Sequence, residues 1–289
     1  MVESADQRFL QAIDAEQPLQ IMGVINAYCA RMAERAGFRA LYLSGAGVAN
    51  AAFGLPDLGM TSLNDVLEEA RRITATTSLP LLVDCDTGWG SPLTIARTVR
   101  EMSRAGVAAI HLEDQIDAKR CGHRPGKQLV TADVMTGRLK AAVDARTDSR
   151  LVIMARTDAA AGEGLDAAID RASRYVEAGA DLIFAEALTE PEHFRKFAQA
   201  MSVPVLANIT EFGRTPLLTV DELRNLGIRL VLYPLTAFRA MNSAAIQVFE
   251  TVRSQGTQQS LLSSMQTRAE LYDVLDYQAF EARLDRDEE

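Results

Sequence analysis

The feature that most constrains the fold is a motif that occurs four times along the chain: a helix end, a glycine and a short, mostly apolar run. The run closes seven positions after the glycine each time, at Ser44, Glu113, Glu186 and Pro234. Glycine suits the left-handed cap at which a helix stops. A short apolar run bounded by turns is typical of a strand that is buried on both faces. The motif therefore predicts helices that alternate with buried strands.

Four further apolar runs lie between these motifs and raise the number of predicted strands to eight. They begin near Ile21, after Pro80, at Leu151 and after Pro204. Eight alternations of strand and helix favour a single parallel (β/α)8 barrel of the TIM type over residues 1–289, with an open doubly wound sheet as the alternative. Helical sequence continues past the eighth strand, so a helical C-terminal extension is expected over residues 240–289, packed on the barrel or on a neighbouring subunit.

Composition narrows the class of protein further. Hydrophobic residues make up 48% of the chain, so a large core can form and wholesale disorder is excluded. The net charge is −9 and no Lys/Arg tract occurs, which argues against nucleic acid or a membrane surface as a partner. The three cysteines form no disulfide framework, and residues 1–18 lack the features of a signal peptide. We expect a cytoplasmic protein.

Polar residues gather where the predicted strands end, which is where barrels of this type carry their chemistry. Asp84 and Asp86 are two residues apart and point the same way in extended chain. Together with Glu113 they offer hard oxygen ligands, which favour Mg²⁺ or Mn²⁺ over zinc. The alternative is that each aspartate caps the following helix or closes a turn.

The segment 119–127 carries four positive charges and a histidine within nine residues of an acidic protein. Because neighbouring cations stabilise a thiolate, we expect a lowered pKa for Cys121. Gly122 permits the backbone angles that a mobile lid requires. The alternative is a solvated basic loop with an incidental cysteine. Cys29 and Cys85 lie in apolar patterns and are predicted to be inert core residues.

Three arginines complete the set of charged candidates. Arg156 closes a buried strand, so it either neutralises a carboxylate substrate or bridges Asp158. Arg239 and Arg268 lie in the late helical segments, where a surface position is the default.

A set of sequence motifs resembles the isocitrate lyase/phosphoenolpyruvate mutase superfamily and, within it, the 2-methylisocitrate lyase family. The matches span nearly the whole chain. They are YLSGAGV at 42–48, GLPDLG at 54–59, VDCDTGWG at 83–90, HLEDQ at 111–115, KRCGHRPGK at 119–127, MARTDA at 154–159, FAEA at 184–187, NITEFG at 208–213, YPLTAFRAMN at 233–242 and MQTR at 265–268. NITEFG is the discriminating piece, because isocitrate lyases differ there. Gly126 departs from the asparagine of some members.

The resemblance implies a fold, an assembly and a reaction. The fold is a barrel whose eighth helix is swapped between two subunits, and two such dimers form a homotetramer. This arrangement would account for the surplus C-terminal helices. The reaction is the Mg²⁺-dependent cleavage of a tricarboxylate, (2S,3R)-2-methylisocitrate, to pyruvate and succinate, in propionate breakdown through the methylcitrate cycle.

The resemblance also implies roles for individual residues. Cys121 would protonate the succinate aci-carboxylate, with His123 tuning the thiol, and Arg156 would stabilise the oxygen that becomes the keto group. Tyr42 is a weaker candidate for the base that takes the proton of the substrate hydroxyl. The metal ligands would be Asp84, Asp86 and Glu113. The residues that hold the two ends of the substrate would be Ser44, Gly45, Ala46, Gly122, Arg156, Glu186, Asn208, Ile209, Thr210, Arg239 and Arg268.

Two rival interpretations remain open. The first is a sister enzyme that cleaves 2,3-dimethylmalate or isocitrate, since discrimination of one methyl group is worth only about 1–3 kcal/mol. Oxaloacetate decarboxylases and phosphonopyruvate-handling enzymes should not need Cys121 as an acid. The second is a non-catalytic barrel that binds a dicarboxylate, which would be expected to have lost part of the site.

Overall fold

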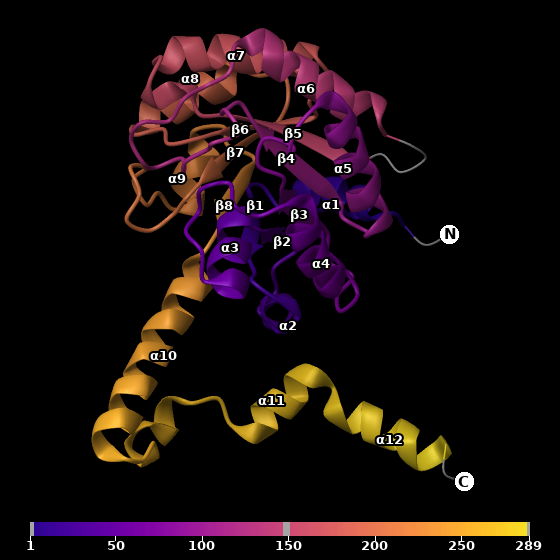
Figure 1. Cartoon of the computed structure of the whole chain (residues 1–289), viewed down its shortest axis with the longest axis vertical. Coiled ribbons are helices and arrows are strands. Elements are labelled where there is room, and N and C mark those ends of the chain that lie inside the picture. Colours follow the sequence, from indigo (N-terminus) through magenta and orange to yellow (C-terminus); the bar gives the residue numbers. More distant parts are fainter. Residues whose placement is uncertain (1–2, 147–150, 288–289) are drawn as a thin grey trace.

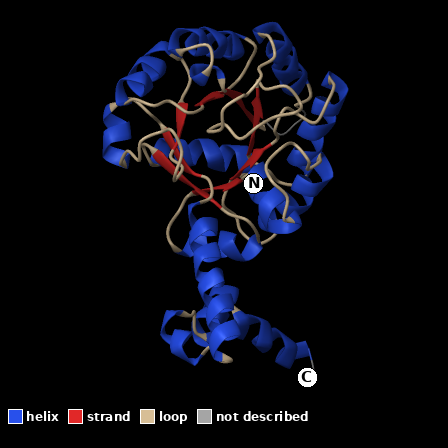
Figure 2. Cartoon of the chain, turned by 60° about the vertical axis from the view of Figure 1, so that its left-hand side comes forward, coloured by secondary structure: helices blue, strands red, loops and turns tan. Residues whose placement is uncertain are grey.

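The computed structural model describes residues 3–146 and 151–287 and shows a closed barrel of eight parallel strands, joined in sequence order. Figure 2 shows the strands as a ring inside the helices. The last strand pairs with the first, with Leu19 opposite Leu230. The predicted barrel is confirmed and the open sheet is wrong. The strands are β1 Leu19–Gly23, β2 Ala40–Leu43, β3 Leu81–Asp84, β4 Ala109–Glu113, β5 Val152–Thr157, β6 Leu182–Ala185, β7 Val205–Asn208 and β8 Leu230–Tyr233.

Helices form the outer layer of the barrel (Figure 1). They are α2 Ala27–Arg35, α3 Gly45–Phe53, α4 Leu63–Thr74, α5 Pro92–Arg104, α6 Ala132–Asp144, α7 Leu165–Glu177, α8 Pro191–Ala200 and α9 Val220–Asn225, with a short 3-10 helix η1 Ala159–Ala161. Capping boxes fix the starts of α4, through Ser62 and Asp65, and of α9, through Thr219 and Glu222. Among the described residues, every helix is too short or too polar to cross a membrane.

Alternate strand residues build two separate apolar cores. Outward-facing residues such as Leu41 and Val83 pack beneath the helices. Inward-facing residues such as Leu82 and Phe184 fill the barrel. The helix α1 Ala5–Ala15 adds the fully buried Phe9 to the inner core. The inner core is apolar along the lower part of the strands, so polar groups are confined to their C-terminal ends.

The residues after β8 form an arm that leaves the barrel. Helix α10 Thr236–Gln255 extends away from the strands, and none of its residues is buried (Figure 1). The arm continues through η2 Gln259–Ser264, α11 Arg268–Leu275 and α12 Tyr277–Asp287. Helix α11 returns to α2, where Arg31 forms an ion pair of 3.1 Å with Asp276.

Candidate active site

The alternation of side chains explains why polar groups meet at one end of the barrel. Leu82 and Met154 face the barrel interior, so Asp84 and Arg156, two residues further along β3 and β5, face the same way at its mouth. Other buried polar residues of the strand ends are Tyr42, Ser44, Asp86, His111, Glu113, Asp158, Glu186, Asn208 and Thr210. The strand-end residues singled out from sequence therefore converge.

Asp84 is held as an ionised carboxylate. Its oxygens accept hydrogen bonds from the backbone N–H groups of Gly45, at 3.1 Å, and Asp86, at 3.0 Å. Burial alone would raise the pKa of Asp84, but His111 and the nearby cationic side chains bring this pKa below its ordinary value. The N–H of Gly45, expected to face the substrate, is thus already engaged by Asp84.

Apart from ion pairs with Lys119 and Arg156, the buried oxygens of Asp86 and Glu113 lack hydrogen-bond partners within the described residues. Burial raises the pKa of Asp86 to about 7 and the pKa of Glu113 well above its ordinary value. Lys119 forms an ion pair with Asp86 and another, at 2.7 Å, with Asp57. The ammonium group therefore supplies the positive charge next to these carboxylates.

The three expected metal ligands offer a suitable donor type. In residues 3–146 and 151–287, no three His, Cys, Asp or Glu side chains converge tightly enough to form a ready-made metal site. Buried carboxylate oxygens without hydrogen-bond partners nevertheless fit a hard cation, and Mg²⁺ usually keeps several waters and takes only one or two carboxylates directly. The donor set fits Mg²⁺ held partly through water.

Tyr42 and His111 form a neutral pair below the carboxylates. The phenol oxygen of Tyr42 lies 3.0 Å from His111 Nε2, and the two rings are stacked. Burial, reinforced by Asp84, raises the pKa of Tyr42 well above its ordinary value, and burial lowers the pKa of His111 to about 4. Tyr42 therefore lies in the site, within reach of Asp84 and His111, and its role as the base stays a prediction.

Arg156 is the centre of an ion-pair network. Its guanidinium lies 3.4 Å from Glu113, 2.9 Å from Asp158 and 3.1 Å from Glu186. The same group sits over the ring of Phe184, with 5.0 Å between Arg156 Cζ and the ring centroid. The bridge to Asp158, one of two interpretations of the sequence, is therefore present, and it fixes the guanidinium at the mouth.

The loop 119–127 is folded over the mouth and is tied to the barrel by Lys127. The ammonium group of Lys127 donates to the carbonyl oxygen of Gly122, at 2.6 Å, and lies 2.8 Å from Asp158. Gly122 is buried against the site, and a Cβ there would lie 2.5 Å from Glu186 Cγ. Glycine is thus required at this position for close approach rather than for a special backbone angle.

His123 connects the loop to the segments that follow β6 and β7. Its Nε2 lies 3.0 Å from Glu186, and its Nδ1 accepts a hydrogen bond of 3.0 Å from the backbone N–H of Arg214. Burial alone would raise the pKa of Glu186, but Arg156 and His123 bring this pKa below its ordinary value. The side-chain amide of Asn208 lies 3.4 Å from both oxygens of Glu186.

The expected pKa of Cys121 is wrong in direction. Burial raises this pKa, and the acidic side chains of Asp57 and Glu186 add to the effect, whereas the backbone N–H of His123 and the charge of Arg156 oppose it. The basic residues of the loop were expected to stabilise a thiolate, but Lys119 and Lys127 are engaged by carboxylates. Cys29 and Cys85 are buried, as predicted.

Most of the remaining predicted substrate residues lie at strand ends, whereas Arg239 lies on α10. Ser44 precedes α3 and Ala46 lies in its first turn, while Ile209 and Thr210 are buried just after β7. Arg239, in the first turn of α10, is half-exposed and lies 3.6 Å from Glu211.

Arg268 is not brought to the mouth by this chain. It is exposed and begins α11, in the C-terminal arm (Figure 1). Sequence reasoning also missed Asp57, Lys119 and Lys127, whose ion pairs hold the closed loop. The signal available was the GLPDLG motif at 54–59, together with lysines at both ends of the loop.

Comparison with known proteins agrees with this geometry. The family model of phosphoenolpyruvate phosphomutase matches residues 9–253. A 2-methylisocitrate lyase of Shewanella oneidensis is 59% identical over 99% of this chain and 98% of its own length, and one of Escherichia coli is 56% identical over 98% and 96%.

Solved structures extend the similarity. A 2,3-dimethylmalate lyase of the phosphoenolpyruvate mutase/isocitrate lyase superfamily is 36% identical, with a TM-score of 0.90 over 96% of this chain and 94% of its own. A phosphonopyruvate hydrolase complex with oxalate and Mg²⁺ is 29% identical, with a TM-score of 0.85 over 97% and 98%. The chain therefore belongs to the phosphoenolpyruvate phosphomutase family and, within the isocitrate lyase/phosphoenolpyruvate mutase superfamily, to the 2-methylisocitrate lyase family.

Proposed function

We propose that the chain is a carbon–carbon lyase that cleaves 2-methylisocitrate to pyruvate and succinate in the cytoplasm, as a step of propionate breakdown through the methylcitrate cycle. The identity of 56–59% to 2-methylisocitrate lyases over nearly the whole chain supports this substrate. The observation that carries the proposal is the closed loop: it packs Gly122, the neighbour of Cys121, against Glu186 and Arg156, so the Cys121 thiol lies within reach of the charges of the mouth.

Asp84, Asp86 and Glu113 would hold Mg²⁺, or Mn²⁺ in its place. The buried oxygens of Asp86 and Glu113, which accept no hydrogen bond apart from their ion pairs with Lys119 and Arg156, support this assignment, as does the Mg²⁺ named for the phosphonopyruvate hydrolase complex. When bound, the ion supplies Lewis-acid polarisation of the hydroxyl and carboxylate oxygens at the end of the substrate that becomes pyruvate.

Cleavage needs a proton removed from the substrate hydroxyl and a proton delivered to carbon. The carbon–carbon bond breaks as the hydroxyl oxygen becomes the keto oxygen, and the electron pair of that bond stays on the succinate half. Arg156 is oriented by Asp158 to stabilise the oxygen that becomes the keto group. Arginine suits the carboxylates of such a substrate because its planar fork pairs with two oxygens.

The raised pKa of Cys121 suits the acid that completes the reaction. A thiol that stays protonated at neutral pH has a proton to give, and the carbanion beside a carboxylate is the group that receives it. Loop closure excludes water, which would otherwise compete as the proton donor. A protonated thiol at this position is therefore compatible with the proposed role.

A second candidate is 2,3-dimethylmalate. The solved 2,3-dimethylmalate lyase shares 36% of its residues with this chain, with a TM-score of 0.90. Its substrate also leaves a carbanion to protonate, so the closed loop and thiol would serve both reactions.

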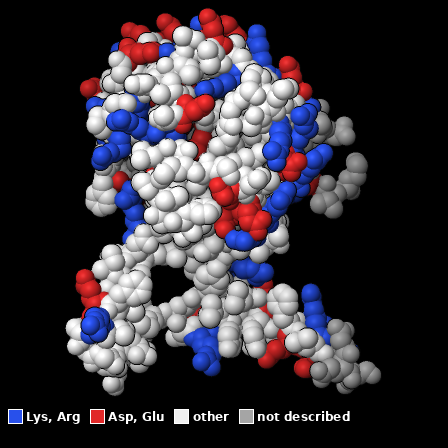
Figure 3. Space-filling model, in the orientation of Figure 1, with Lys and Arg blue, Asp and Glu red and all other residues white. Residues whose placement is uncertain are grey.

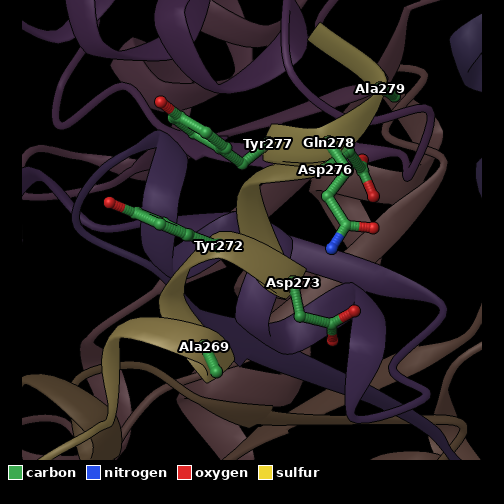
Figure 4. Close-up of a pocket in the computed structure, with 7 residues that line it drawn as sticks. All are labelled: Ala269, Tyr272, Asp273, Asp276, Tyr277, Gln278 and Ala279. Atoms are coloured by element: carbon green, nitrogen blue, oxygen red, sulfur yellow. The ribbon is translucent and has the colours of Figure 1, made fainter. Parts of the chain in front are cut away.

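We propose that the protein assembles as a homotetramer of helix-swapped dimers. Helix α10 carries exposed apolar side chains, among them Ile246 and Phe249, and Figure 3 shows large uncharged areas over the C-terminal arm. A cavity of about 400 Å³ lies at the elbow between α11 and α12, away from the barrel mouth, and the stacked Tyr272 and Tyr277 line it (Figure 4). A swapped arm would also carry Arg268 towards another subunit.

The deciding experiment measures pyruvate release from 2-methylisocitrate, isocitrate and 2,3-dimethylmalate, each with Mg²⁺ and with EDTA. We expect a strong, metal-dependent preference for 2-methylisocitrate. Preference for another of the three acids would move the substrate assignment to a sister lyase. No cleavage of any of them by the folded oligomer would overturn the proposed function.

A further inference from the structure

The carboxylate of Asp114 lies behind the barrel wall and has no role in the chemistry proposed above. Its neighbour Glu113 belongs to the mouth, so Asp114, the next residue, turns towards α7 on the outside of the strands. The residue is completely buried. A buried carboxylate is costly unless it is hydrogen-bonded and paired with a cation, so its partners indicate what it holds in place.

Three donors converge on the Asp114 carboxylate. The backbone N–H of Asp158 donates to one oxygen at 2.9 Å. The hydroxyl groups of Thr157, at 2.8 Å, and Tyr175, at 3.0 Å, donate to the other. Arg171 lies 3.6 Å away and supplies the positive charge. The carboxylate therefore ties the end of β5 to α7.

Asp158, whose backbone N–H is held by Asp114, joins the ion pairs at the mouth. Asp158 accepts hydrogen bonds from Arg156, at 2.9 and 3.2 Å, and from Lys127, at 2.8 Å. Lys127 in turn holds the carbonyl oxygen of Gly122 in the closed loop. A shift of the Asp158 backbone would move the guanidinium and release the loop together.

We infer that Asp114 is a positioning residue for the reaction: by holding the backbone of Asp158, it aims Arg156 and keeps the loop 119–127 closed. The inference rests on the proposed lyase activity for its kinetic consequence only. Its structural consequence, the closure of the loop that carries Cys121, is independent of the substrate.

The test is Asp114→Asn. The amide keeps the size of the carboxylate but presents an N–H₂ group to one set of donors, so it cannot accept all three hydrogen bonds. Because misplacement by about 1 Å can cost on the order of 10²-fold in rate, we expect kcat to fall roughly 10- to 100-fold, with a smaller change in KM. We also expect iodoacetamide to alkylate Cys121 faster, as followed by peptide mass spectrometry, since the loop loses its anchor.

Asp181→Asn is the matched control. Asp181 accepts a hydrogen bond of 2.8 Å from the backbone N–H of Ile153, at the opposite end of β5, and pairs with Arg146 at 2.6 Å. Its loss should lower the melting temperature without changing kcat or the alkylation of Cys121. Equal effects of Asp114→Asn and Asp181→Asn on both readouts would reduce Asp114 to a structural residue and overturn the inference.

A third variant, Tyr175→Phe, serves if Asp114→Asn does not fold. It removes one of the three donors and leaves the carboxylate in place, so we expect the same two changes at smaller size, and unchanged alkylation would overturn the inference. If the wild-type protein cleaves none of the three acids, the proposed function fails. The alkylation comparison then still decides whether Asp114 holds the loop.

Discussion

At the scale of single residues, the sharpest prediction concerns Cys121. A general acid contributes about 10²–10⁴-fold to a rate, so Cys121→Ser should lower kcat by that order while binding of pyruvate with Mg²⁺ persists. Steady-state kinetics and a thermal-shift titration with pyruvate and Mg²⁺ measure the two properties. Cys29→Ala, in the buried part of α2, is the control and should keep its kcat. Unchanged turnover in Cys121→Ser would remove the acid role.

The pH dependence of the Cys121 thiol follows from the direction of its pKa shift. Burial raises this pKa above that of a free cysteine, so the reactive thiolate is scarce at neutral pH and increases as the pH rises. The rate of alkylation at Cys121 should therefore still be rising at about pH 9. A rate that levels off below about pH 8 would show a stabilised thiolate and would restore the expectation from the basic loop.

Metal dependence is tested at Asp86. Replacing it with alanine removes one of the buried carboxylates of the mouth, whose one partner group among the described residues is the Lys119 ammonium. The variant should need a higher Mg²⁺ concentration for half-maximal activity. Asp133→Asn is the control, because Asp133 is exposed in the first turn of α6 and pairs with Arg174 of α7, outside the mouth. An identical Mg²⁺ titration in Asp86→Ala and wild type would contradict the metal assignment.

At the scale of elements, the closed loop makes a prediction at Gly122. A Cβ there would lie 2.5 Å from Glu186 Cγ and 2.6 Å from Arg156 Nη2, so Gly122→Ala cannot close the loop without moving the site. We expect kcat/KM to fall on the order of 10²-fold with little change in melting temperature, because the loop adds little to the core. Gly137→Ala, with open space around the new Cβ in α6, should keep full activity. Wild-type kinetics in Gly122→Ala would show that catalysis does not need this closure.

The elements were predictable from sequence for a physical reason. A strand buried on both faces must be apolar, and a helix that stops at a left-handed residue favours glycine. Runs such as those ending at Ser44 and Glu113 therefore predict both the end of a helix and the buried strand that follows it. The alternation of side chains then places Asp84 and Arg156 at one mouth. The pKa of Cys121 could not be predicted in this way, because it depends on burial and on which carboxylates engage the loop lysines.

At the scale of the whole molecule, sequence alone could not place the C-terminal arm. Apolar and polar residues alternate in α10 as they do in a helix that packs on its own barrel, yet α10 leaves the barrel and stays exposed. Which surface covers a helix depends on loop geometry and on other subunits, neither of which a local pattern records. For the same reason the sequence could not show that Arg268 lies away from the mouth of its own barrel, since Arg268 belongs to the arm.

The arm gives the prediction that belongs to the assembly. Ile246 and Phe249 are 55% and 70% exposed on α10, and leaving such side chains in water forgoes roughly 1.5–3 kcal/mol each. If a second copy covers them, the double substitution Ile246→Glu and Phe249→Glu should yield a smaller species in light scattering. Activity should fall with the loss of assembly if, as proposed, a swapped arm carries Arg268 to the site of another subunit. Lys196→Glu, a charge change on the exposed face of α8, should leave the assembly intact. An unchanged mass in the double variant would show that this face of α10 lies outside the interface.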